Sequence, residues 1–358
     1  MDSHTALPPF PDGWYHAARS DELRAGAVTG RTLAGRSLAL YRTASGRAVA
    51  TNGHCPHLGA PLAQAGTVVG EELRCGMHGF CFDAEGRCVR TGYGTRAPPK
   101  ALLGIWSVLE RNGFVFVWHS AAGRAPEWTI PELNLTGFSS LSTKSYQLRA
   151  HPQETTENSV DLGHLGVLHG YRDVEMTAPM RTEGAYLTAS FAFSRRASFL
   201  GRRGDVRAFY TVHVHGLGYS FVDAEVPEFG FRTQQFVLTR PTDPGQLELT
   251  IGLRARLTEP AAAGSLRARV KHRALGEILR LLVFHGFKGD VGQDFPVWDQ
   301  KRFLEHPALA EGDGPIGAYR RWARQFYPVY PVYPVYPVYP EGRGARAGAS
   351  PTTAEEGT

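Results

Sequence analysis

Cysteine is scarce in this chain: there are four among 358 residues, and all four lie in the first quarter of the sequence. Disulfide-stabilised secreted domains carry cysteine more densely, so that class is excluded. The first eleven residues contain no apolar stretch typical of a secretory signal, and no run of about 18 apolar residues could span a membrane. We therefore expect a cytoplasmic protein without a membrane span, in which clustered cysteines bind metal.

Long blocks of like charge are also missing. The formal net charge is +5, and the densest basic runs are the pairs Arg195–Arg196 and Arg202–Arg203. A nucleic-acid surface normally needs a basic stripe, so we expect no nucleic-acid partner. The mild positive charge is better suited to docking an acidic electron-donor protein. The chain length indicates about two domains.

The sequence predicts an all-β domain over residues 10–120, because its apolar runs are short and separated by turn signals. Asn112-Gly113 lies between two apolar runs and predicts a tight hairpin. A Pro- and Gly-bearing connector leads to a second domain, residues 132–326. There, strand-like runs and one helical segment, Ser265–Phe287, favour an α+β fold in which a long helix covers a sheet. The strand-like runs are Tyr186–Ser194, Arg207–His215, Phe231–Thr239 and Leu247–Leu257.

Residues 327–358 differ in composition from the rest. A Tyr-Pro-Val repeat runs from Tyr327 to Pro340, and a Gly-, Ala-, Thr- and Ser-rich tail follows. Regular proline fixes φ and removes amide donors, which predicts a polyproline II rod. We expect the tail to be disordered and to have no catalytic role.

Two short segments each offer one cysteine and one histidine. Cys55 and His57 stand in the first, and Cys75 and His78 in the second. Structural zinc of the finger type pairs cysteine with cysteine and histidine with histidine. One Cys and one His per loop instead suits a [2Fe-2S] Rieske cluster, in which one iron takes both thiolates and the other both imidazoles. A zinc-stabilised binding protein is the weaker alternative.

A second set of candidate ligands follows in the other domain. Asp161 and His164 are three apart and share a helix face, whereas His164 and His169 are five apart, about 140° around a regular helix. The two histidines therefore point together only if the helix is irregular, which Gly163 and Gly166 favour. Two histidines and a carboxylate form the facial triad of non-haem Fe(II) oxygenases.

The third iron ligand should be a distant carboxylate. Asp290, Asp294 and Asp299 all stand just after the predicted long helix. Spacing alone leaves all three as candidates.

Over residues 10–326 the sequence resembles the Rieske non-haem iron oxygenases, on the branch of the 3-ketosteroid 9α-hydroxylase oxygenase components and cholesterol 7-desaturases. The resemblance implies an N-terminal Rieske domain and a C-terminal helix-grip catalytic domain. The matching segments are Cys55–Ala60, Cys75–His78, Pro98–Ala101, Glu110–Trp118 and Pro126–Trp128.

The resemblance also implies residue roles. His164 and His169 match the family's iron-binding histidines. Asp294, with Gln293 before it and Trp298 after it, matches the late carboxylate, which selects it over the other two candidates.

The family further implies a head-to-tail homotrimer in which the cluster of one subunit lies near the iron of the next. Asp161 would then carry electrons from His57 or His78 of one chain to His164 of its neighbour. Asn158, in the same segment, is a further candidate for a place near the iron.

The implied reaction consumes O₂ and two electrons to hydroxylate or desaturate a hydrophobic, steroid-like or polycyclic substrate. Since the chain has no Gly-rich nucleotide fingerprint, the electrons would come from a separate flavin and iron–sulfur reductase or a ferredoxin. The alternative is a Rieske electron-transfer protein whose second domain binds a ligand without chemistry.

Overall fold

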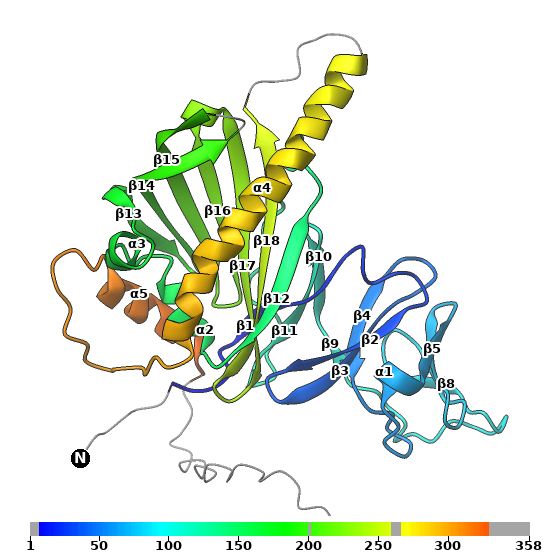
Figure 1. Ribbon diagram of the computed structural model, residues 1–358. Helices are drawn as coiled ribbons and strands as arrows, with labels where there is room; N and C mark the ends of the chain where they lie inside the picture. Colours follow the sequence, from blue (N-terminus) through cyan, green and yellow to red (C-terminus); the bar gives the residue numbers. More distant parts are fainter. Residues whose placement is uncertain (1–6, 200–201, 259–265, 329–358) are drawn as a thin grey trace, which may run out of the picture. The chain divides into compact units, whose positions relative to one another are not determined.

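The computed structural model describes residues 7–199, 202–258 and 266–328. All but the first two residues of the predicted polyproline rod, and the whole tail, lie outside the described residues. Three antiparallel sheets fill the N-terminal part, with strand orders β1-β11-β10, β2-β3-β4-β9 and β5-β6-β7-β8 (Figure 1). The elements are β1 (Gly13–Arg19), β2 (Val28–Leu33), β3 (Arg36–Arg42), β4 (Ala48–Asn52), α1 (Leu62–Ala65), β5 (Gly66–Val69), β6 (Glu72–Cys75), β7 (Cys81–Phe82), β8 (Cys88–Arg90), β9 (Ile105–Trp106), β10 (Val108–Arg111) and β11 (Phe114–His119).

The predicted hairpin at Asn112-Gly113 is confirmed. Arg111 pairs with Phe114, and the two turn residues have φ values of 57° and 86°. Positive φ at both positions gives the turn whose twist matches that of paired strands.

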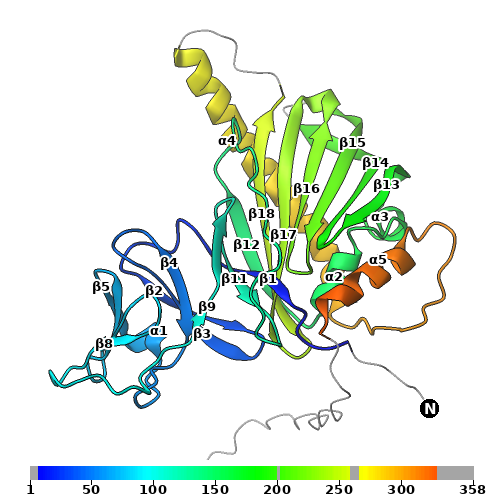
Figure 2. The same cartoon turned by 180° about the vertical axis from the view of Figure 1, so that it is seen from behind.

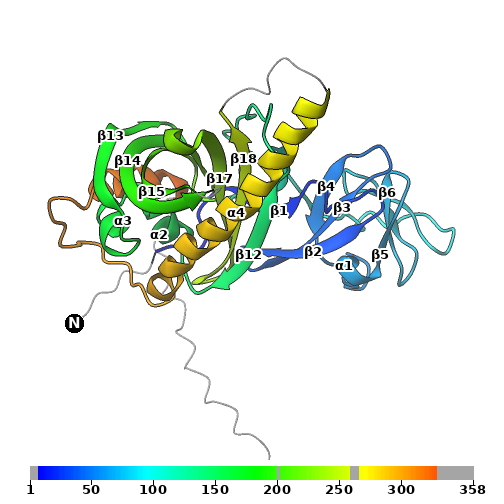
Figure 3. The ribbon, with the colours of Figure 1, turned by 45° about the horizontal axis from the view of Figure 1, so that its top comes forward.

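A seven-stranded antiparallel sheet dominates the C-terminal part, in the order β12-β18-β17-β16-β15-β14-β13. Figure 3 shows it curving strongly toward its β13–β15 end. All four predicted strands are present. The edge strands β12 and β13 were missed because their exposed faces are polar, and β16 was also missed. The strands are β12 (Ser142–Leu148), β13 (Arg172–Glu183), β14 (Tyr186–Phe199), β15 (Arg202–His215), β16 (Tyr219–Val226), β17 (Phe231–Asp243) and β18 (Gln246–Leu257).

The long helix α4 (Leu266–Trp298) crosses one face of this sheet (Figure 1). Its predicted end at Phe287 is wrong, since the helix continues for three more turns. The glycines there have low helix propensity, but Val291 and Trp298 pack into the core against the sheet, and such packing supplies most helical stability. The other helices are α2 (Pro152–Glu157), α3 (Gly163–Val167), α5 (Ile316–Ala323), η1 (Pro227–Phe229) and η2 (Arg324–Phe326).

The two faces of the seven-stranded sheet have different neighbours. On β18, Leu249 and Leu253 face α4, whereas Gly252 faces the opposite side, close to the Phe114 ring of β11. There the small sheet β1-β11-β10 packs against β16 and β17, through Phe116 and Phe236 among others (Figure 2). The cluster-bearing segment leaves this small sheet after β1 and returns to it at β10.

This shared core crosses the predicted domain limits, residues 10–120 and 132–326, which stay a prediction. Among the described helices, none is long and apolar enough to cross a membrane.

Candidate cluster site and candidate iron site

The two predicted cluster loops have the same backbone hydrogen-bond pattern. In each, the cysteine N–H donates to the carbonyl five residues later at 2.8 Å, and the cysteine carbonyl accepts from a glycine N–H at 2.9 Å. The cysteines are Cys55 and Cys75, and the glycines are Gly59 and Gly79, with φ of 77° and 69°. Left-handed φ suits glycine, so each tight loop is specified by its own sequence.

The four predicted cluster ligands are arranged as a thiol pair and an imidazole pair. Cys55 and Cys75 are buried and free of disulfides, and burial together with the adjacent Cys75 thiol raises the pKa of Cys55 to about 11. The His57 and His78 rings are 4.7 Å apart, and the buried Nδ1 of His57 has no hydrogen-bond partner. Two buried thiols and an unpaired ring nitrogen fit a cluster that takes thiolates on one iron and imidazoles on the other.

A single zinc ion fits this arrangement poorly. Bonds of about 2.0–2.3 Å would bring all four donor atoms close together around one tetrahedral ion. Among the described residues, however, the cluster ligands do not supply three donor atoms that lie within 4.8 Å of one another.

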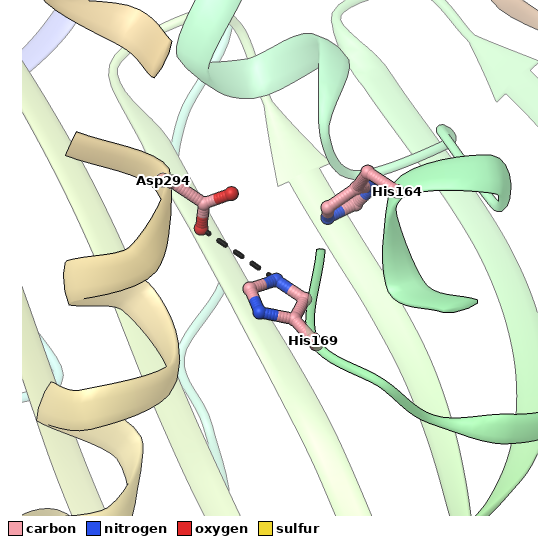
Figure 4. Close-up of side chains that lie close together, drawn as sticks. All are labelled: His164, His169 and Asp294. Carbon is pink, nitrogen blue, oxygen red and sulfur yellow. Dashed lines mark ion pairs between the residues drawn. The ribbon is translucent and has the colours of Figure 1, made fainter. Parts of the chain in front are cut away.

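A group of that kind exists in the C-terminal part, where one donor atom each from His164, His169 and Asp294 lie within 4.8 Å of one another. Figure 4 shows the three side chains facing a common space. His169 Nε2 is 3.7 Å from Asp294 Oδ2, and the two imidazole ring centres are 5.1 Å apart. Three predicted ligands, from two distant segments, therefore meet.

The two histidines meet because α3 is short. The helix ends at Val167, and the His169 N–H donates to the His164 carbonyl at 3.3 Å. This bond spans five residues, as in a π turn. The predicted irregularity is therefore present, as a π-type turn at the helix end.

Two amide side chains orient the candidate ligands. Gln293 Oε1 lies 3.0 Å from His169 Nδ1, so it accepts from that nitrogen when it is protonated and leaves Nε2 for a metal. Asn158 Nδ2 donates to Asp294 Oδ1 at 3.2 Å. Burial raises the pKa of Asp294, against the opposing effect of the two histidines. A divalent cation would offset the cost of that buried carboxylate.

A buried ion-pair network holds the end of α2, where Asn158 lies. The Glu157 carboxylate accepts from Arg320 Nε at 2.6 Å and from Lys301 Nζ at 3.2 Å. Asn158 follows directly, so its amide is held toward Asp294.

Asp161 lies beside His164. Its Oδ1 accepts from the His164 backbone N–H at 3.1 Å and lies 3.5 Å from that ring's Nδ1. Burial raises the pKa of Asp161, but the hydrogen bonds from His164 outweigh this effect and hold it below the ordinary value. The side chain is 30% exposed, so it is reachable from outside the chain.

The two other candidate carboxylates are engaged elsewhere. Asp290 pairs with Arg195, with 2.7 Å between Oδ2 and Nη1. Asp299 Oδ1 accepts from the Arg149 backbone N–H at 3.2 Å. Geometry therefore favours Asp294, as the sequence resemblance implied.

A cavity of about 290 Å³ lies between α4 and strands β14–β17. Most of its lining is apolar. The polar groups include Arg195, Tyr210, Gln235 and Asp290. The sequence analysis gave no role to Arg195. Its position as a charged residue directly after the apolar run Tyr186–Ser194 was the one feature that could have pointed to it.

Two family descriptions match the chain. The Rieske [2Fe-2S] domain covers residues 13–99, and the 3-ketosteroid 9alpha-hydroxylase C-terminal domain covers residues 117–327. The chain belongs to the Rieske oxygenases of the 3-ketosteroid 9α-hydroxylase family.

Its relatives include a cholesterol 7-desaturase of Ciona intestinalis, 30% identical over 352 residues that cover 90% of this chain and 70% of the relative. The oxygenase component of a 3-ketosteroid-9-alpha-monooxygenase of Rhodococcus rhodochrous is 24% identical, over 89% of this chain and 81% of that protein. Among solved structures, apo dicamba monooxygenase has the same fold, with a TM-score of 0.67, 19% identity, and 89% and 98% of the two chains covered.

This Rieske oxygenase is therefore an oxidoreductase with a [2Fe-2S] cluster and a mononuclear non-haem iron. The oxygenase prediction is confirmed, and the electron-carrier alternative is not supported.

Proposed function

We propose that this Rieske oxygenase hydroxylates or desaturates a steroid-like substrate held in the cavity between α4 and the sheet. The observation that carries the proposal is the meeting of His164, His169 and Asp294 beside α4, the helix that also lines that cavity. A cavity of about 290 Å³ is near the lower end of small-molecule sites. Its apolar lining favours a hydrophobic molecule, and the steroid-oxidising relatives narrow the class.

In this proposal His164, His169 and Asp294 hold the mononuclear iron. When bound, this iron supplies dioxygen activation with electrons delivered through the cluster. Gln293 keeps the His169 ring turned so that Nε2 faces the metal, and Asn158 holds one carboxylate oxygen of Asp294. The surrounding apolar side chains exclude water from the reacting carbon.

Cys55 and Cys75 would hold one cluster iron, and His57 and His78 the other. The surface beside these histidines is apolar, since Leu58, Met77 and Tyr93 are between 58% and 66% exposed. Exposed apolar side chains around a redox group favour contact with another protein surface.

We further propose a homotrimer in which this apolar surface meets a neighbouring copy. The partly exposed Asp161 would then join His164 to a cluster histidine of that neighbour. A separate flavin and iron–sulfur reductase or ferredoxin would reduce the cluster, in the cytoplasm.

The reaction is tested with the anaerobically purified protein, a ferredoxin and its reductase, NADH and labelled O₂. Progesterone, cholesterol and naphthalene serve as probes, with product mass spectrometry. We expect one labelled oxygen gained, or two hydrogens lost, with a steroid. Oxidation of naphthalene alone would overturn the steroid assignment, and absence of any product from fully metal-loaded protein would overturn the reaction.

Assembly is tested separately by light scattering. We expect a trimer, and Asp161→Asn should slow the transfer of electrons from reduced cluster to product while leaving metal content unchanged. A monomer with undiminished activity would contradict the inter-subunit path.

A further inference from the structure

One arginine contacts both chain segments that supply the candidate iron ligands. On β14, Arg195 Nη1 donates to Tyr171 Oη at 3.1 Å and to Asp290 Oδ2 at 2.7 Å. Tyr171 stands two residues after His169, and Asp290 lies one helical turn before Asp294 on α4. These three side chains form what we call the Arg195 bridge.

We propose that Arg195 is a positioning residue that fixes the separation of the two ligand-bearing segments and so tunes iron binding. The inference rests on the proposed function, in which His169 and Asp294 hold the iron. Arg195 would act through Tyr171 and Asp290 and would not touch the metal.

The tyrosine end of the bridge is firmly held. Its ring stacks on Phe193, with ring centres 4.2 Å apart and planes inclined by 6°. The Arg195 guanidinium lies 5.0 Å from the Tyr171 ring centre. The ring centre of His169, on the same segment as Tyr171, is 5.4 Å from the Tyr171 ring centre. A shift of Tyr171 would therefore be felt by His169, because packed rings move together.

The helix end of the bridge is a forked ion pair. A second contact, from Nη2 of Arg195 to Oδ1 of Asp290, measures 3.4 Å, so the planar guanidinium meets both carboxylate oxygens. Both residues also line the cavity. The ion pair thus joins the sheet to α4 beside the cavity. Because side chains do not fill this space, packing holds α4 less firmly here than where the helix contacts the sheet directly.

A purely stabilising ion pair would behave differently from a positioning one. Arg207 on β15 offers a matched control, because it pairs with Glu175 and its side chain has the same exposed fraction as that of Arg195, 33%. Arg207 does not line the cavity. Loss of either pair affects stability, but only loss of the Arg195 bridge should affect metal binding.

The experiment titrates Fe(II), under anaerobic conditions, into full-length protein that retains its cluster but has had the mononuclear iron removed by chelation. Arg195→Met should weaken Fe(II) binding about tenfold, the lower end for groups that orient ligands, with the cluster absorption unchanged. Arg207→Met should bind Fe(II) like the wild type. Tyr171→Phe, which loses one hydroxyl, should fall between them.

Arg195→Lys covers the case in which the methionine variant does not fold. Lysine keeps the charge but lacks the fork, so it should recover only part of the affinity. Wild-type affinity in Arg195→Lys and Tyr171→Phe, with binding abolished in His169→Ala, would overturn the inference and leave the iron site intact. Unchanged Fe(II) binding in His169→Ala would instead show that the proposed iron site is wrong.

Discussion

The cluster loops and the iron site are built in different ways. Each cluster loop is closed by its own backbone hydrogen bonds and a left-handed glycine, so its geometry is set within a few residues. The iron site joins α3 to α4, and side-chain contacts from Gln293, Asn158 and Arg195 hold its geometry. The first site is specified locally and the second by the tertiary fold.

Exposure separates the two regions as well. Leu58 and Met77, beside the cluster histidines, are largely exposed, whereas Asp294 is 5% exposed. An electron can cross a protein surface, but a reactive oxygen species must be kept from water. The cluster region is therefore exposed for electron transfer, and the iron site is buried for the oxygen chemistry.

The largest effect is expected from a substitution that removes the cluster and leaves the iron site unchanged. Cys75→Ser should abolish the visible absorption of the cluster, because serine does not replace a thiolate ligand. Fe(II) binding at the separate iron site should persist. Cys88→Ser is the control, since that half-buried thiol donates to the Arg90 carbonyl and is not one of the predicted cluster ligands. Retained cluster absorption in Cys75→Ser would refute the ligand assignment.

Asp294→Ala should have the opposite effect, in which the iron site is lost and the cluster is retained. Product formation should fall by at least about 100-fold, because the metal loses a charged ligand, while the cluster absorption stays at the wild-type level. Asp299→Ala, which removes contacts with the Arg149 backbone N–H and the Gln300 side-chain amide, should keep most activity. Iron analysis and product assays check both variants, and equal losses would mean that the carboxylate was misassigned.

A subtler change tests whether side chains hold the iron site. Asn158→Ala leaves Asp294 Oδ1 without its amide donor and should weaken Fe(II) binding about tenfold. Anaerobic titration measures the change. An unaltered dissociation constant would show that the amide bond does not help to place the carboxylate.

The smallest effects concern the cluster loops. Gly59→Ala meets only the left-handed backbone penalty, about 1–2 kcal/mol, since no atom lies within 4 Å of the added carbon. Gly79→Ala should cost more, because its Cβ would lie 2.8 Å from Gly92 Cα. Thermal unfolding with the cluster bound ranks the two variants, and an equal or inverted ranking would contradict the close approach of Gly92 to Gly79.

The ligands of the cluster were easier to predict from the sequence than those of the iron, because the cluster loops are specified locally and the iron site by the tertiary fold. The spacing of Cys55, His57, Cys75 and His78 is local, and it indicated their chemistry directly. The carboxylate could not be chosen by spacing, because its selection depends on how α4 lies on the sheet. Only the resemblance singled out Asp294.

The main error concerned the end of α4. The predicted helix ended at Phe287, before further glycines and Pro296, yet Val291 and Trp298 continue it and pack on the apolar face of the sheet. A single sequence does not show which distant residues contact one another in the fold. For the same reason the partners of Arg195 could not be predicted. The strand pattern, in contrast, was readable in β14, β15, β17 and β18, although β16 was missed.

The small sheet β1-β11-β10 has a mechanical consequence for electron delivery. The cluster-bearing segment departs from one outer strand of this sheet and re-enters at the other, so it is anchored at both ends rather than tethered by one. A doubly anchored segment resists swivelling. In the proposed trimer, the direction in which the cluster faces would thereby be set within each chain before assembly.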